Sequence, residues 1–101
     1  MTIYNVTFFY PPHLADGVRR WLAEAWMPAA DAAGCKPPSA LAMESAQEGV
    51  ERLAVHCHFR SRSEADAFAA REASLLVEDM QSRFGAQSVM AFPTVMEEIS
   101  L

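Results

Sequence analysis

The chain is poor in the residues that would cross-link it or bind nucleic acid. It has 2 cysteines in 101 residues, Cys35 beside Gly34 and Cys57 within an apolar segment, without C-x-x-C spacing. We therefore expect no disulfide framework, and interpret Cys57 as a small core residue rather than a nucleophile. Its 8 basic residues are scattered and outnumbered by 13 acidic ones, so that the net charge is −5. This balance predicts no nucleic-acid partner.

Long apolar runs are also missing. No run approaches the roughly 18 residues that would cross a bilayer, and the first residues, Met1–Asn5, lack the charged start and apolar stretch of a signal peptide. We predict a cytoplasmic protein with no membrane partner. Hydrophobic residues at 51% and charged residues at 21% are typical of a globular chain. The length predicts one domain, residues 1–101, which is small enough to gain from dimerisation.

The hydrophobic pattern predicts the order strand, helix, strand, strand, helix, strand. β-branched and aromatic residues, alternation and turn signals place strands at 2–10, 39–46, 51–60 and 87–98, with 36–38 as a connector and 47–49 as a hairpin turn. Apolar residues at helical spacing fill 13–33 and the segment from a cap at Ser63 to a stop at Gly85. Pro28 should kink the first helix, or break it, near Ala25–Met27.

This order is the split β-α-β arrangement of the α+β class. It implies a ferredoxin-like, four-stranded antiparallel sheet in the order 4-1-3-2, with both helices on one face. Pro93 interrupts the last strand, and a proline cannot donate to a sheet ladder. That proline independently favours an edge position for the last strand.

The strands carry apolar residues on both faces, whereas two helices can cover only one. If Val55 and Cys57 face the helices, the opposite face presents His56 and His58 with Met90, Phe92 and Met96 or their alternates. Leaving such large apolar side chains in water would forgo about 1.5–3 kcal/mol each. We therefore predict a homodimer formed through the open sheet face, around a cavity that can hold a small-molecule ligand.

Two histidines are the sharpest chemical feature. His56 and His58 are two residues apart on a strand, so they project from the same face and could bind one metal or bracket one substrate. A metal would need a third ligand, for which His13 and Glu44 are candidates by residue type only. The alternative is that both histidines hydrogen-bond within a dimer interface. We predict no metal and no cofactor.

Polar residues on the first and last strands could join the histidines. Asn5 and Thr7 share one face of the first strand, and Thr94 is on the last. With His56 and His58 they would converge in an otherwise apolar cavity, which is typical of a small-molecule site. Trp26 could wall its mouth. If the protein is an enzyme, a neutral histidine would remove a phenolic or α-carbonyl proton while Asn5 stabilised the oxyanion; otherwise Asn5 is a sheet residue and Trp26 packs helix against sheet.

The whole chain resembles a family of small bacterial proteins known as a domain of unknown function. The residues that carry the resemblance are Ile3–Thr7, Trp21, Pro28, Gly34, Glu48, Gly49, Arg83–Gly85, Phe92–Thr94 and Glu97. The resemblance implies a ferredoxin-like fold of the dimeric α/β-barrel group, whose members include cofactor-independent monooxygenases, cyclases, haem-degrading enzymes and stress-response proteins. It implies no catalytic residue set. The chain departs from the family pattern at His56–His58 and at Pro37 and Pro38.

Three function classes stay open at this point. The first is a homodimer that binds a small organic molecule in an interfacial cavity. The second is a cofactor-independent monooxygenase or cyclase, and the third is a metal-binding or purely structural dimerisation module. An RNA-binding domain with the same strand order would carry aromatic residues on its third strand, where this chain has Ala54, His56 and His58.

Overall fold

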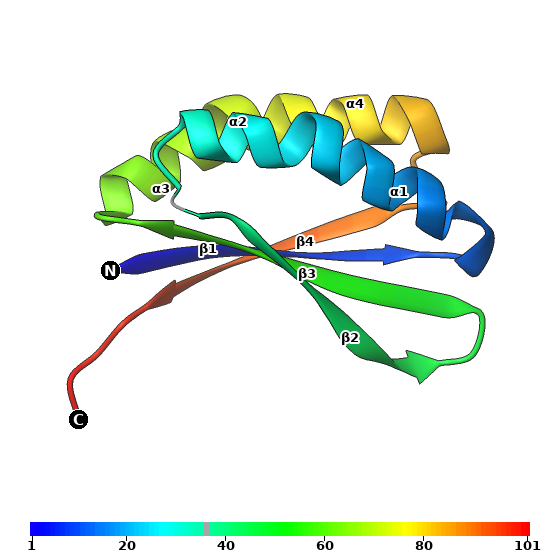
Figure 1. Cartoon of the computed structure of the whole chain (residues 1–101), viewed down its shortest axis with the longest axis horizontal. Coiled ribbons are helices and arrows are strands. Elements are labelled where there is room, and N and C mark those ends of the chain that lie inside the picture. Colours follow the sequence, from blue (N-terminus) through cyan, green and yellow to red (C-terminus); the bar gives the residue numbers. More distant parts are fainter. Residues whose placement is uncertain (36) are drawn as a thin grey trace.

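A four-stranded antiparallel sheet forms one layer of the protein, and the helices cover one of its faces (Figure 1). The computed structural model describes residues 1–35 and 37–101, so Lys36 of the predicted connector lies outside the described residues. The strand order is β2-β3-β1-β4, which confirms the predicted topology. The strands are β1 (Thr2–Tyr10), β2 (Ser39–Gln47), β3 (Val50–Phe59) and β4 (Met90–Glu97).

The last strand lies at the edge of the sheet, as its proline predicts. Strand β4 pairs with β1, and Pro93 stands opposite Val6. The strand is shorter than the predicted range 87–98, because residues 86–88 turn after the helix stop at Gly85, whose φ is +95°. The hairpin between β2 and β3 turns at Glu48 and Gly49, and Gly49 adopts a φ of +81° there.

The first helical segment runs through Pro28 without leaving the helix. It consists of η1 (Pro12–Leu14), α1 (Ala15–Trp21), the π-helical η2 (Leu22–Trp26) and α2 (Met27–Ala32). The expected irregularity therefore takes the form of a π-helical stretch directly before Met27 and Pro28, not of a break into two pieces. A wider helical turn is one way to accommodate a proline, which has no N–H to donate.

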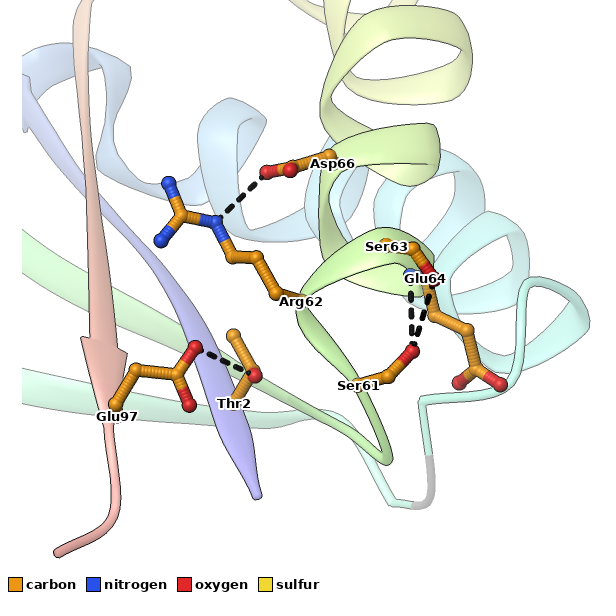
Figure 2. Close-up of polar contacts among 7 residues, drawn as sticks. All are labelled: Thr2, Ser61, Arg62, Ser63, Glu64, Asp66 and Glu97. Carbon is orange, nitrogen blue, oxygen red and sulfur yellow. Dashed lines mark hydrogen bonds and ion pairs between the residues drawn. The ribbon is translucent and has the colours of Figure 1, made fainter.

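The N-cap of the second helical segment lies two residues earlier than predicted. It consists of α3 (Arg62–Phe68), the π-helical η3 (Ala69–Ala73) and α4 (Ser74–Phe84). The prediction of Ser63 as the N-cap was wrong. Ser61 has the extended backbone of an N-cap, and its Oγ accepts a 3.3 Å hydrogen bond from the backbone N–H of Glu64 (Figure 2). Ser61 and Glu64 have the spacing of a capping box. The Arg62 Nε also lies 3.0 Å from Asp66 Oδ1.

The core lies between the helices and the sheet and is rich in aromatic rings. Trp26 packs edge-on against Phe8 and Phe68, with centroid distances of 5.3 and 5.8 Å. The indole N–H of Trp21 donates to Asp79 Oδ2 at 2.9 Å and so links α1 to α4. At one end of the sheet, Thr2 Oγ1 donates to Glu97 Oε1 at 2.8 Å and links β1 to β4 (Figure 2).

Candidate functional site

The sheet face opposite the helices, here called the open face, carries most of the predicted site. The pairing registers place on it alternate residues of all four strands: Ile3, Asn5, Thr7 and Phe9; Ser39, Leu41 and Met43; Arg52, Ala54, His56 and His58; and Met90, Phe92, Thr94 and Met96. Since helices cover only the other face, no other part of the described chain covers this one (Figure 1).

Five of the six predicted site residues share the open face. Asn5 stands on the central strand β1, directly opposite His56 on β3 and Thr94 on β4. Directly opposed side chains in an antiparallel sheet have Cβ atoms about 4.5–5.5 Å apart. Thr7 is one step along the same face, and His58 one step the other way, opposite Ile3. The sequence pattern thus located a polar row across the middle of the sheet.

The sixth residue, Trp26, does not belong to this group. Its side chain is fully buried between helix and sheet, on the opposite face from Asn5. The expectation that Trp26 walls the mouth of the site was therefore wrong. The physical reason is the helical phase: Trp26 lies on the inward stripe with Val18 and Leu22, all three of which are buried.

Asn5 holds an unusual polar atom. The residue is only 9% exposed, and its Nδ2 donates a 3.3 Å hydrogen bond to Thr7 Oγ1. Its Oδ1 is buried and, within the described part of the chain, accepts no hydrogen bond. A buried acceptor without a donor costs about 1–3 kcal/mol, and such groups are rare in native proteins. Among the described residues one other buried side-chain atom has no hydrogen-bond partner, the indole Nε1 of Trp26 on the covered side of the sheet.

The two histidines are near each other but lack a third ligand. The ring centroids of His56 and His58 are 6.4 Å apart, and His58 Nδ1 contacts Met1 Sδ at 3.1 Å. Among the described residues no cluster of three His, Cys, Asp or Glu side chains could hold a metal ion, so neither His13 nor Glu44 completes such a set. Both histidines lie on the open face, opposite Asn5 and Ile3 of β1.

The cysteines lie on the covered face, as predicted for Cys57. Cys35 and Cys57 are both free and buried. Burial, and then the neighbouring Cys35, raise the pKa of the Cys57 thiol from 9.0 to about 12. A thiol held in its protonated form is a poor nucleophile, which agrees with a role in the core.

Large apolar side chains surround the polar row. Leu41, Met43, Met90, Phe92 and Met96 are 37–51% exposed. Towards the hairpin end of the face lies a shallow hollow of about 330 Å³, lined by Thr7, Phe9, Met43, Arg52, Phe92 and Thr94. The sequence reasoning missed Arg52 and Phe9 here. Strand parity could have found both, because Arg52 shares its phase with His56, and Phe9 with Asn5.

Solved structures of the same topology define the class of protein to which this chain belongs, the ferredoxin-like fold. A dimeric ferredoxin-like protein from an uncultured marine organism is 12% identical with a TM-score of 0.60, over 99% of this chain and 97% of its own. Rv0793 from Mycobacterium tuberculosis is 18% identical with a TM-score of 0.61, over 100% and 98%. A protein described as an "ethyl tert-butyl ether d (ethd) family protein", from Bacillus halodurans, is 12% identical with a TM-score of 0.62, over 98% of this chain and 100% of its own.

A family of related sequences gives a more specific assignment than the fold. Residues 1–99 match the family described as Domain of unknown function (DUF4286), and the chain belongs to that family. This confirms the resemblance seen in the sequence. No curated protein matches the chain. Within the described residues, no helix combines the length and apolar character needed to cross a membrane.

Proposed function

We propose that the protein forms a homodimer through its open faces and binds a small organic molecule between the two sheets. The observation that carries the proposal is the buried Oδ1 of Asn5, which lacks a donor in the centre of a largely apolar face. A hydroxyl or N–H group of a bound molecule would supply that donor and recover the desolvation cost. Apolar surface with a few convergent polar groups is the usual character of a small-molecule site.

The exposed apolar side chains support a second copy of the chain as the cover. Leu41, Met43, Met90, Phe92 and Met96 are each about half buried already, so covering both copies contributes on the order of 10 kcal/mol. Association itself costs about 4–15 kcal/mol. Because the two quantities are similar, a molecule bound at the interface would strengthen the dimer. The marine protein of the same fold is described as dimeric, which agrees with this proposal.

Because Asn5 Oδ1 is a hydrogen-bond acceptor, it favours ligand binding over oxygenase or cyclase chemistry. An oxyanion needs a hydrogen-bond donor, but the unpartnered atom of Asn5 is an acceptor, and the Nδ2 donor is already bonded to Thr7. His56 stands opposite Asn5 and could still accept a proton from a bound hydroxyl. Binding is therefore the primary function proposed here. A cytoplasmic location stays a prediction of the sequence.

The test compares two neutral probes that differ only in the replacement of a hydroxyl hydrogen by a methyl group. At pH 7, 2-naphthol can donate to Asn5 Oδ1, whereas 2-methoxynaphthalene cannot. Calorimetric or fluorescence titration should show 2-naphthol bound about tenfold more tightly, because a site with an unpaired polar group discriminates against the analogue that leaves it unpaired. Asn5→Leu should abolish the difference. Ser39→Ala, an exposed position on the same face, is the control and should retain it.

Two outcomes would contradict the proposal. If the wild type binds neither probe, or prefers the methoxy compound, the open face is not a site that requires a donor at Asn5. If the preference survives in Asn5→Leu, the hydroxyl is recognised elsewhere.

A further inference from the structure

One charged residue stands on the open face of a strongly acidic chain. Among the residues that the pairing registers place on this face, Arg52 is the only one with a charged side chain. Of the acidic strand residues, Glu51 and Glu97 pair in register with Tyr10 and Thr2, on the covered side of the sheet, and Glu44 lies in the irregular part of β2 between Met43 and Gln47. The whole chain has a net charge of −5, so a single cation on a largely apolar face distinguishes this face from the rest of the surface. It would attract an anionic group to one end of that face.

The guanidinium of Arg52 has hydrogen-bonding capacity to spare. Its Nε donates to the backbone oxygen of Glu44 at 3.0 Å, which fixes the side chain against β2. Within the described part of the chain this is the one hydrogen bond found for the side chain, and neither ion pair there includes Arg52. A guanidinium held at Nε with free Nη groups suits a carboxylate, which accepts paired N–H groups.

Aromatic rings and hydroxyls lie beside this cation. Arg52 lines the 330 Å³ hollow together with Phe9 and Phe92, whose rings meet edge to face at 5.4 Å, and with the hydroxyls of Thr7 and Thr94. Two perpendicular rings form an apolar corner, one side a ring face and the other a ring edge, in which a third ring can pack. The hollow thus combines an anion partner with an aromatic surface.

From this combination we infer the chemical class of the bound molecule: a hydroxylated aromatic carboxylate. The inference rests on the proposed function and extends it. The carboxylate binds the Arg52 Nη groups, the ring packs on Phe9 and Phe92, and the hydroxyl donates to Asn5 Oδ1. Arg52 stands opposite Phe9, four residues from Asn5 on β1, a separation of roughly 13 Å between backbone positions.

A pair of probes tests the carboxylate separately from the hydroxyl. 6-Hydroxy-2-naphthoate carries both groups, and 2-naphthol carries the hydroxyl alone. We expect the wild type to bind 6-hydroxy-2-naphthoate about tenfold more tightly than 2-naphthol, since a charge-assisted bidentate pair is stronger than a neutral contact. In Arg52→Gln this gain should fall to within about twofold, while the affinity for 2-naphthol stays unchanged. Arg52→Lys, which keeps the charge but not the fork, should give an intermediate gain.

A matched control removes the same charge from the other side of the sheet. Arg19 lines a groove between α1 and β2 on the covered side, so Arg19→Gln should preserve the full gain. The inference is overturned if the wild type binds both probes equally, or if the gain survives in Arg52→Gln. It is also overturned if Arg52→Gln weakens the dimer without any carboxylate effect, because Arg52 would then pair with an acidic group of the second copy. If 2-naphthol binds but the carboxylate adds no affinity, this inference fails while the proposed function is still supported.

Discussion

The two faces of the sheet are formed by the same strands, but the helices of the chain cover only one of them. On β1, Phe8 is fully buried against Trp21 and Trp26, whereas its neighbour Phe9 lies on the open face with Phe92 as its ring partner. The covered face closes on the chain's own helices and leaves its thiols protonated and buried. The open face keeps half-exposed apolar side chains and an unpaired acceptor at Asn5. The packing that stabilises the fold is thus concentrated on the covered face, whereas the proposed binding uses the open face.

The largest expected effect contrasts two phenylalanines. Phe8→Ala should lower the free energy of unfolding by about 3–5 kcal/mol, because it leaves a cavity in a closed aromatic cluster. Phe92→Ala, at a side chain 51% exposed, should cost below about 1 kcal/mol in dilute protein, where the monomer prevails. Urea unfolding measures both values. Equal losses would show that the two faces do not differ in this way.

The next effect places a charge on the open face. Phe92→Lys should raise the dissociation constant of the dimer at least about 100-fold, because an ammonium group would be buried without a partner. Sedimentation equilibrium measures the constant. Leu75→Lys, at a position 67% exposed on α4, is the control and should leave it unchanged. A Phe92→Lys protein that dimerises like the wild type would rule out the open face as the interface.

A smaller effect has an unusual sign. In ligand-free protein, Asn5→Leu should raise the free energy of unfolding by about 1–2 kcal/mol, because it removes a buried acceptor that lacks a donor. The same variant should lose its preference for the hydroxylated probe. Thermal or urea unfolding tests the stability. A destabilised Asn5→Leu protein would indicate that the second copy already supplies the missing donor.

The smallest effect concerns the covered face at alkaline pH. Burial raises the pKa of Cys57 from 9.0 to about 12, so above pH 9 the unfolded chain loses this proton while the folded chain keeps it. The contribution of Cys57 to the free energy of unfolding is therefore fully present below about pH 8, and it falls by less than about 1 kcal/mol between pH 8 and pH 9.5. Cys57→Ala should show a shallower fall. Identical slopes in urea unfolding at these pH values would place the titrating group elsewhere.

The sequence predicted the sheet better than the details at its borders. Alternation of apolar and polar residues is a direct consequence of strand geometry, so the strand order and the shared face of Asn5, Thr7, His56, His58 and Thr94 could be derived from it. The true cap at Ser61 was missed because Ser61 and Ser63 each precede an acidic residue by three positions, Glu64 and Asp66, and only the backbone conformation separates them.

The candidate site was predicted only in part. Trp26 was misplaced because an aromatic residue in a helix has the same sequence signature whether it packs on the sheet or lines a site. The orphan Oδ1 of Asn5 could not be predicted at all, because satisfaction of a hydrogen bond depends on every neighbouring atom. Arg52 could have been predicted from the strand pattern, since it lies on the same face of β3 as the two histidines.

The mass of the native particle tests the central claim most directly. If a second copy covers the open face, sedimentation equilibrium at micromolar concentration gives about twice the chain mass of 11.1 kDa. A single species of 11.1 kDa under the same conditions, both with and without 2-naphthol, would contradict the account.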